Sequence, residues 1–369
     1  MLSSLSIRIK ECASHVGFDL CGIAPVADFA ELQAFPPWIA DAKHGEMKYM
    51  EARNDVGDLK RASLARVAPW ARSVVVCAIN YNTAQPYSNQ SQPENEQLTN
   101  ATRGWISRYA WGHQDYHDSV LRRLRQLEDA LRGLIAADSK DATCAPPQLR
   151  SYVDTGPLIE RVYAKYAGVG WLGKNTCIIN QQLGSWLFLG VMLTSLEFTQ
   201  DEQFPNLPAP DRCGTCTRCI VACPTQAITA PGVLDARLCI SYLTIEKRGE
   251  IPLELRSGIG RHVFGCDICQ DVCPWNRKAP ATSAPDFTPR QGLVNPALDW
   301  LAEMQQDEFR SVFRGSPIRR AKLSSLRRNA VIAMGNSGDE KFLPTLRKLA
   351  DDPDPIVADH ARWALTQLT

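Results

Sequence analysis

One stretch of the chain, residues 213–274, constrains the fold more than any other. It opens with four cysteines spaced C-x2-C-x2-C-x3-C and followed by a proline, over residues 213–224. It ends with a second block, residues 266–274, that keeps only the last three cysteines of this pattern, and Cys239 stands alone between the blocks. Each proline ends its turn and prevents the preceding cysteine from continuing a helix.

This spacing is that of bacterial ferredoxins, in which the fourth cysteine of each run binds the other cluster of a pair. Three thiolates on one tight loop can cap three corners of a cube, so the fourth ligand comes from elsewhere. We predict one [4Fe-4S] cluster on Cys213, Cys216, Cys219 and Cys273, and a second on Cys223, Cys239, Cys266 and Cys269. Structural zinc also uses C-x2-C pairs, but the doubled C-x3-C-P blocks favour iron–sulfur.

The rest of the composition is ordinary. A chain of 369 residues with 44% hydrophobic residues suggests two or three globular domains, and its net charge of +1 means that any nucleic-acid contact must come from a local patch. Five cysteines outside the block are scattered, mostly in apolar contexts, which predicts reduced thiols and a cytoplasmic location: Cys12, Cys21, Cys77, Cys144 and Cys177. The first 20 residues lack an apolar export signal and a twin arginine, and no apolar run reaches the roughly 18 residues of a membrane span.

Hydrophobic periodicity predicts an α+β protein. Helices are expected over residues 4–16, 31–53, 115–136 and 158–167, and strands over 19–24, 73–79, 148–153, 176–180 and 185–193. We therefore expect a layered α/β domain over residues 1–200, a ferredoxin-like domain over 201–280 and a helical cap over 281–369. The polar, Asn/Gln/Pro-rich residues 82–101 are expected to form a loop.

The C-terminal part is internally repeated. Residues 329–334 align with residues 360–365 at a period of 31, with another helix expected over 342–350 and a helix-capping turn over 351–355. A helix pair of this length is HEAT-like. Just upstream, residues 310–328 carry seven basic residues and no acid, which is typical either of a solvated face or of a surface that contacts a phosphate backbone.

Residues 151–161 are the first candidate for chemistry, because a strand leads there directly into a helix. Asp154 or Thr155 is a natural N-cap, and Pro157 would lie in the first helical turn. The functional alternative makes Asp154 a proton donor whose pKa is raised by burial. Arg161 could then hold a substrate or balance charge.

Two further stretches are ambiguous. Residues 168–176 form a glycine-rich loop before a strand, which is not a P-loop and could serve either a tight connection or the approach of a flat cofactor. Residues 108–117, rich in aromatic residues and histidine, open the long helix and could be core and capping groups or could line a site.

Taken together, these stretches resemble the epoxyqueuosine reductase family, cobalamin-dependent iron–sulfur enzymes that catalyse the last step of queuosine biosynthesis. The resemblance rests on residues 109–117, 153–161 and 170–175 and on the eight-cysteine block, and it covers nearly the whole chain. It implies an N-terminal cobalamin-binding domain of the nitroreductase fold, related to that of reductive dehalogenases. It also implies two [4Fe-4S] clusters that pass single electrons to the cobalt, and a tRNA substrate with epoxyqueuosine at the wobble position of a GUN anticodon.

The resemblance also implies roles for individual residues. Asp154 takes the position of the proton donor, with Arg161 as its partner in the pocket. Cobalamin contacts are implied for Asp154, Lys174, Asn175, Thr176, Ser185, Ser241, Gly265 and Cys266, and substrate contacts for His117, Arg319, Arg320 and Lys322. Reduction of the epoxide to an alkene and water takes two electrons and two protons, and an aspartic acid held neutral suits the donor. A flavodoxin or ferredoxin would supply the electrons to a monomeric enzyme.

Other classes of protein fit less of the chain. A reductive dehalogenase would share the cobalamin and both clusters, but the missing twin-arginine signal, the basic run and the Asp154 motif disfavour it. A simple electron-transfer protein leaves some 200 N-terminal residues without a role. A cobalamin carrier without turnover would be distinguished from an enzyme by testing whether the clusters deliver electrons to bound cobalt. An RNA-binding scaffold would explain the basic run but not the cysteines.

Overall fold

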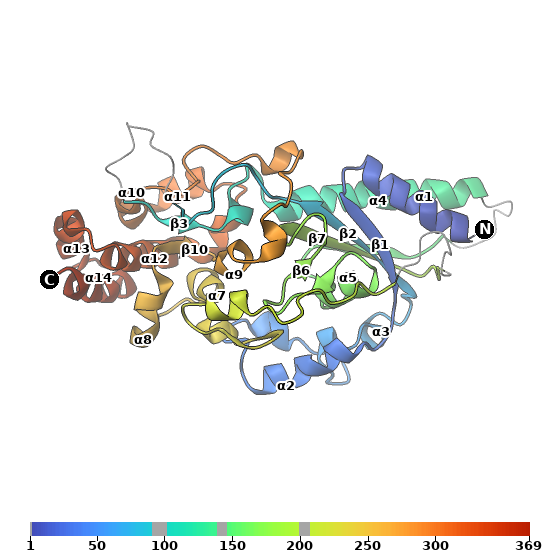
Figure 1. Cartoon of the computed structure of the whole chain (residues 1–369), viewed down its shortest axis with the longest axis horizontal. Coiled ribbons are helices and arrows are strands. Elements are labelled where there is room, and N and C mark those ends of the chain that lie inside the picture. Colours follow the sequence, from blue (N-terminus) through green and yellow to red (C-terminus); the bar gives the residue numbers. More distant parts are fainter. Residues whose placement is uncertain (1, 91–101, 139–145, 199–206) are drawn as a thin grey trace. The chain divides into compact units, whose positions relative to one another are not determined.

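A computed structural model describes residues 2–90, 102–138, 146–198 and 207–369. The chain forms two compact units that are each built from non-consecutive segments (Figure 1). Unit 1 comprises residues 1–82, 116–216 and 274–284, and unit 2 comprises residues 83–115, 217–273 and 285–369. The three consecutive domains expected from the sequence stay a prediction. Among the described residues, no helix combines the length and the apolar composition needed to cross a membrane.

Unit 1 is built on an antiparallel sheet with the strand order β1-β2-β7-β4. The strands are β1 (Leu20–Pro25), β2 (Ser73–Asn80), β4 (Leu149–Tyr152) and β7 (Leu187–Thr194), which confirms four of the five strands expected from the sequence. The fifth is reduced to β6 (Ile178–Ile179), which pairs with β5 (Trp171–Leu172) in a separate two-stranded sheet. Every residue of β2 is buried, as its β-branched run predicts.

Helices cover both faces of this sheet. On one side lie α1 (Leu2–His15) and α4 (Tyr116–Asp138), and on the other lies α5 (Glu160–Tyr166) (Figure 1). The approach of α4 depends on Gly190 of β7, because a Cβ atom there would come within 2.7 Å of Val120 and 2.9 Å of Leu124. Side chains alternate along a strand, so the next residue, Val191, points to the other face and joins a core with Val162 of α5.

Between β1 and β2 the chain forms short helices instead of the single helical patch expected over residues 31–53. They are η1 (Ala30–Ala34), α2 (Phe35–Ala40), η2 (Lys48–Glu51), η3 (Lys60–Ala62) and α3 (Leu64–Val67). Phe35, Ile39 and Leu59 form a small core against which Ile159 packs. This segment therefore lies beside the start of α5.

Unit 2 holds most of the cysteine block on short elements. In chain order these are β3 (Trp105–Ile106), η4 (Arg108–Ala110), α6 (Arg218–Val221), β8 (Ile228–Ala230), β9 (Val233–Leu234), η5 (Ala236–Leu238), α7 (Ile240–Ile245), α8 (Leu253–Arg256), η6 (Ser257–Ile259), β10 (His262–Phe264) and α9 (Ile268–Asp271). The strand β3 pairs with β10, and α6 packs against α9, so the two cysteine blocks lie side by side. Of the loop expected over residues 82–101, residues 91–101 lie outside the described residues, and the remainder forms no helix or strand.

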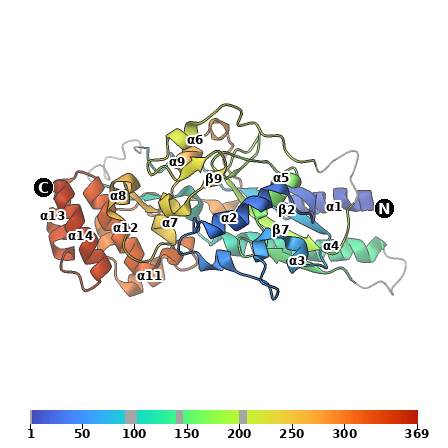
Figure 2. The ribbon, with the colours of Figure 1, turned by 90° about the horizontal axis from the view of Figure 1, so that it is seen from below.

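The C-terminal part of unit 2 is helical. Its elements are η8 (Pro285–Phe287), α10 (Leu298–Glu303), α11 (Gln306–Val312), η9 (Pro317–Ala321), α12 (Lys322–Asn336), η10 (Glu340–Phe342), α13 (Leu343–Leu349) and α14 (Pro355–Leu368). Figure 2 shows α12, α13 and α14 stacked side by side. The expected helix over 342–350 is confirmed as α13, and the carboxylate of Asp354 caps α14 by accepting the N–H of Ile356 at 3.0 Å. The HEAT-like assignment stays a prediction.

The basic run at residues 310–328 is not one continuous solvated face. Arg328 is fully buried and donates hydrogen bonds to the carbonyl oxygens of Leu243 at 2.7 Å and Gly249 at 2.6 Å. Arg327 forms an ion pair with Asp352 at 2.5 Å. These two arginines are bound within the fold because the α7 region and the turn before α14 supply acceptors for them. Arg310, Arg314, Arg319 and Lys322 are exposed.

Candidate active site

Asp154 occupies a strained turn directly after β4. Its φ angle is +58°, and the N–H of Thr155 donates to the carbonyl oxygen of Val153 at 2.8 Å. A three-residue turn with positive φ at a non-glycine centre is rare, and such strain is concentrated at functional sites. The expectation that Asp154 or Thr155 caps the helix is wrong. The helix α5 begins only at Glu160, after the N-cap residue Ile159, so Pro157 also precedes its first turn.

The first turn of α4 supplies two partners for the Asp154 carboxyl group. The hydroxyl of Tyr116 donates to its Oδ2 atom, and His117 Nε2 lies 3.4 Å from the same oxygen. The ring of Tyr116 stacks on Phe188 of β7 with a centroid separation of 4.2 Å, which fixes its hydroxyl. The Asp154 side chain is nevertheless 51% exposed, so the carboxyl group is accessible to a ligand as well as held.

These partners determine the charge of Asp154. Desolvation of the carboxyl group by neighbouring atoms acts to raise the pKa of Asp154. The hydrogen bonds from His117 and Tyr116 and the positive charge of Arg161 outweigh this effect, so the pKa is lowered. The predicted upward shift of this pKa is therefore wrong in sign, and the carboxyl group is ionised near neutral pH. Asp154 is therefore placed where a proton donor could act, but its lowered pKa does not favour the protonated form that a donor needs.

Arg161 lies one residue into α5 and is exposed. Its Nη1 atom donates to the carbonyl oxygen of Thr176 at 3.0 Å. Thr176 also has a positive φ, +66°, at the end of the glycine-rich loop. Arg161 thus connects α5 to this loop and acts on Asp154 through its charge.

Glu160 is a residue of this site that the sequence analysis missed. It is buried, with 8% of its surface exposed, and its Oε1 atom accepts the backbone N–H of Asp154 at 2.8 Å. Burial and the neighbouring carboxylate of Asp154 hold the pKa of Glu160 well above its usual value. The signal in the sequence was an acid at the very start of the expected helix, six residues after Asp154.

The glycine-rich loop packs tightly against its own hairpin. A Cβ atom at Gly170 would come within 2.4 Å of the carbonyl oxygen of Ile179, and one at Gly173 within 2.5 Å of the Ile179 side chain. These two glycines serve close packing, the plainer of the two alternatives. Lys174 donates to the carbonyl oxygens of Gly214 at 2.6 Å and Cys216 at 2.9 Å, so it holds the first loop of the cysteine block.

Other residues predicted to contact cobalamin have protein partners. The Asn175 Oδ1 atom accepts the N–H of Cys177 at 3.3 Å. Ser185 and Asn276 bind each other twice, through the Ser185 N–H at 2.7 Å and the Asn276 amide at 2.8 Å. In unit 2, Ser241 lies in α7, and Gly265 has a φ of +72° and donates its N–H to Thr244 at 2.9 Å. A cobalamin contact of these residues stays a prediction.

The cysteines divide between the two units. Cys213 and Cys216 belong to unit 1, and the other six predicted ligands belong to unit 2. Within unit 2, burial raises the pKa of the Cys266 thiol, and the charges of Cys239 and Cys223 act in the same direction. The described residues contain no three His, Cys, Asp or Glu side chains already arranged around a single metal ion, so both ligand sets stay predictions.

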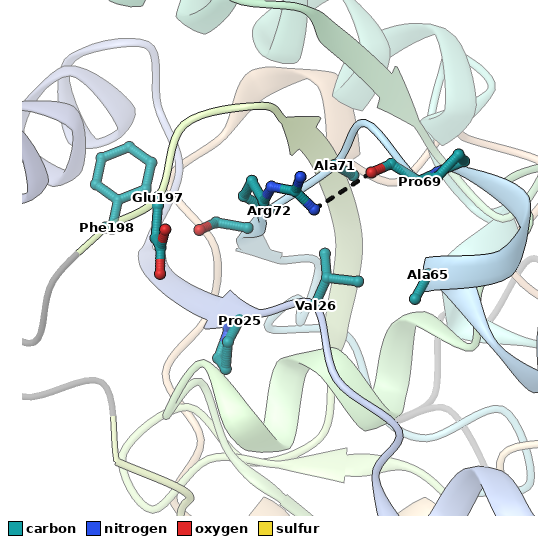
Figure 3. A pocket seen from close by; sticks show the side chains of 9 residues that line it. Pro25, Val26, Ala65, Pro69, Ala71, Arg72, Glu197 and Phe198 are labelled. Atoms are coloured by element: carbon teal, nitrogen blue, oxygen red, sulfur yellow. Dashed lines mark hydrogen bonds between the residues drawn. The ribbon is translucent and has the colours of Figure 1, made fainter.

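A cavity of about 420 Å³ lies elsewhere in unit 1 (Figure 3). Its lining includes Pro25 at the end of β1, Ser73 at the start of β2, and Arg72 and Glu197. In the sheet register, Ser73 is paired with Thr194, and Thr194 with the first residue of β4. Asp154 lies two residues beyond the last residue of β4, so the cavity is at the other end of this strand and is separate from the acid turn.

Comparisons with known proteins agree with these features. The domain family described as "4Fe-4S double cluster binding domain" matches residues 212–276, and the family described as "Epoxyqueuosine reductase QueG, DUF1730" matches residues 61–155. An epoxyqueuosine reductase from Vibrio cholerae is 39% identical over 99% of this chain and 92% of its own length.

Two solved structures are similar over the whole chain. An epoxyqueuosine reductase with an epoxyqueuosine-modified tRNA-Tyr stem loop is 31% identical, with a TM-score of 0.84, and 91% of it is covered. A Bacillus subtilis epoxyqueuosine reductase, with an aspartate catalytic loop swung out of its active site, is 30% identical, with a TM-score of 0.83 and 91% coverage.

The double-cluster domain and the acid turn define the chain as an iron–sulfur oxidoreductase. More closely, the extent of its identity to the curated relatives shows that it belongs to the epoxyqueuosine reductase family.

Proposed function

We propose that this chain reduces epoxyqueuosine to queuosine at the wobble position of tRNA, with Asp154 delivering the proton. The observation that carries the proposal is the half-exposed carboxyl group of Asp154, held on a strained turn by Tyr116 and His117. The family to which the chain belongs supports the reaction. The relative with a swung-out aspartate loop supports an aspartate on a loop as the catalytic group.

The residues of the acid turn would act on the oxygen of the epoxide. Removal of that oxygen as water takes two electrons and two protons and leaves an alkene. As the ring opens, negative charge develops on the oxygen, and a nearby acid lowers the barrier by supplying a proton. Tyr116 and His117 would aim the Asp154 carboxyl group, and Arg161 would attract the developing negative charge.

Two [4Fe-4S] clusters and cobalamin are the proposed cofactors, and when bound they supply the electrons and the reductive cleavage. The donor set fits such clusters, because Cys223, Cys239 and Cys266 are cysteines within the matched double-cluster domain and thiolates are the ligands that [4Fe-4S] clusters require. In the glycine-rich loop, the buried indole N–H of Trp171 in β5 has no hydrogen-bond partner among the described residues. Such a donor costs about 1–3 kcal/mol if unpaired, so the loop fits an acceptor group such as a side-chain amide of a corrin.

Binding of tRNA would use the exposed part of the basic run. We assign phosphate contacts to Arg319, Arg320 and Lys322, and a contact with the modified base to His117. The related structure with a tRNA stem loop supports an RNA substrate, and the GUN anticodon follows from the modification itself. A modified base must leave its stack to reach the acid turn, as in other enzymes that act on a base.

The remaining assignments complete the proposal. The enzyme would work as a monomer in the cytoplasm, away from membranes, and would receive electrons from a flavodoxin or ferredoxin. Single-electron delivery matches the one-electron chemistry of [4Fe-4S] clusters.

The test is an anaerobic assay of the reconstituted protein. The clusters are rebuilt, a strong reductant is added with or without cobalamin, and tRNA containing epoxyqueuosine is analysed for queuosine. We expect queuosine only when cobalamin is present. Bound cobalamin without product would contradict the substrate, and the absence of cobalamin binding would contradict the cofactor.

A further inference from the structure

Beside Asp154 lies a second carboxyl group, that of Glu160, which the mechanism described so far does not use. It is buried at the start of α5 and accepts the backbone N–H of Asp154 at 2.8 Å. This hydrogen bond ties the Glu160 carboxyl group to the backbone of Asp154, and the neighbouring Asp154 carboxylate raises the pKa of Glu160. Two carboxyl groups in such contact do not both ionise near neutral pH, so the pair retains one proton.

The surroundings determine which oxygen carries that proton. The charged and titratable groups around the pair are Arg61 and Arg161 near Glu160, and Tyr116, His117 and Arg161 near Asp154. Burial and the Asp154 carboxylate raise the pKa of Glu160 and outweigh the attraction of the arginine. The hydrogen bonds from His117 and Tyr116 lower the pKa of Asp154 against the effect of burial. The proton therefore resides on Glu160, and Asp154 is the ionised partner.

We propose that Glu160 is a positioning residue that stores the proton for Asp154 and holds its strained turn in place. This inference rests on the proposed function and deepens it. In the proton transfer, the O–H bond of Glu160 breaks and an O–H bond forms on Asp154. Asp154 then gives this proton to the oxygen of the opening epoxide, whose electrons come from the reductive chemistry proposed above. The half-exposed Asp154 carboxylate then takes a proton from the solvent and passes it to Glu160. This restores the pair, which can deliver the second of the two protons in the same way.

The variant Glu160→Gln separates proton storage from positioning. The amide can accept the Asp154 N–H and donate to the Asp154 carboxylate, but it has no proton to give. Only Asp154, with its lowered pKa, can then hold the proton. We expect turnover of epoxyqueuosine tRNA to fall at least about tenfold at neutral pH, and the alkaline limb of the pH profile to move down by at least about one unit.

The matched control is Glu128→Gln. Glu128 is a half-buried carboxyl group of α4 that accepts a hydrogen bond from Ser151 of β4, so the substitution perturbs the same unit without touching the turn. It should leave the pH profile unchanged. An unshifted limb in Glu160→Gln, or an equal loss at every pH, would overturn proton storage.

A second readout needs no turnover. Infrared spectra of the cofactor-loaded protein without substrate should show the carbonyl band of a protonated carboxylic acid at neutral pH. Because the pKa of Asp271 is raised to about 8, that carboxyl group also contributes to the band, so the readout is the difference between variants. We expect the band to lose intensity in Glu160→Gln and to be unchanged in Glu128→Gln. An equal band in Glu160→Gln and the unsubstituted protein would overturn the inference. If the protein reduced no epoxyqueuosine at any pH, the proposed function would be wrong. The infrared difference between the unsubstituted protein and Glu160→Gln would still test whether Glu160 carries the proton.

Discussion

The acid turn of unit 1 and the middle of α12 in unit 2 both hold charged side chains, but in opposite ways. Arg328 is fully buried and donates to four backbone carbonyl groups, those of Leu243, Lys247, Arg248 and Gly249. Asp154 is 51% exposed, sits on strained backbone and is bound by side chains that shift its pKa. The first arrangement stabilises a fold, whereas the second keeps a charged group available for chemistry at the expense of local strain.

The largest effect is expected from Asp154→Ala. If the turn serves chemistry, turnover of epoxyqueuosine tRNA should fall about a thousandfold, because a positioned acid contributes roughly 10²–10⁴ to a rate. Iron content and cobalamin absorbance should be unchanged, because the substitution removes only the carboxyl group. Exposed Asp129 of α4 provides the control Asp129→Ala, which should retain full activity. Full activity of Asp154→Ala would remove Asp154 as the donor.

At the buried Arg328 we expect a substitution to lower the stability of the fold rather than to act on turnover directly. Arg328→Met fills similar space but leaves the carbonyl groups of Leu243 and Gly249 without their donor. We expect the free energy of unfolding to fall by about 3 kcal/mol. The check is the midpoint of anaerobic urea unfolding, with Arg310→Met as the control. Arg310 is 66% exposed and pairs with Asp307 at 3.4 Å, so its loss should change stability by less than about 0.5 kcal/mol. Equal midpoints for both variants would contradict the distinction.

These two regions also show what the sequence could predict. The β-branched run predicted β2 correctly, and the leucine spacing predicted α4 correctly. In both cases the buried face is set by residues that are close in the sequence. The cysteine spacing is also a local pattern, and the cluster domain that it predicted is confirmed by the matching domain family. The role of Asp154 stays a prediction.

The errors concern residues whose charge or burial depends on contacts with residues far away in the sequence. The sign of the Asp154 pKa shift was wrong because His117 and Tyr116, nearly 40 residues earlier in the chain, donate to its carboxylate. Arg328 was counted with a basic run because its acceptors lie about 80 residues earlier in the chain. Asp154 was expected to cap α5 because a strained turn at positive φ gives no signal in a single sequence.

The exposed members of the basic run sharpen the comparison further. Arg319 and Lys322 are exposed, so we expect them to contact phosphate groups rather than stabilise the fold. The double variant Arg319→Gln, Lys322→Gln should reduce the slope of log affinity for tRNA against log salt by about 1–2, since each lost phosphate contact removes roughly 0.7–0.9. Binding titrations at several salt concentrations measure this slope. The charge-matched control is the double variant Arg125→Gln, Arg132→Gln, which changes two exposed arginines of α4 outside the basic run. An unchanged slope would place the RNA surface elsewhere on the molecule.

The smallest effect is expected from Tyr116→Phe, which removes one hydrogen bond from the acid turn. Phenylalanine keeps the stacking on Phe188, so the fold should be unaffected. Without the hydroxyl, the ionised form of Asp154 loses a donor, and the pKa of Asp154 should rise by up to about one unit. The pair then retains its proton to higher pH, and the alkaline limb of turnover should move upward, opposite to the shift expected for Glu160→Gln. A limb that moves downward in both variants would mean that Tyr116 itself supplies the proton, and that the ionised Asp154 only orients it.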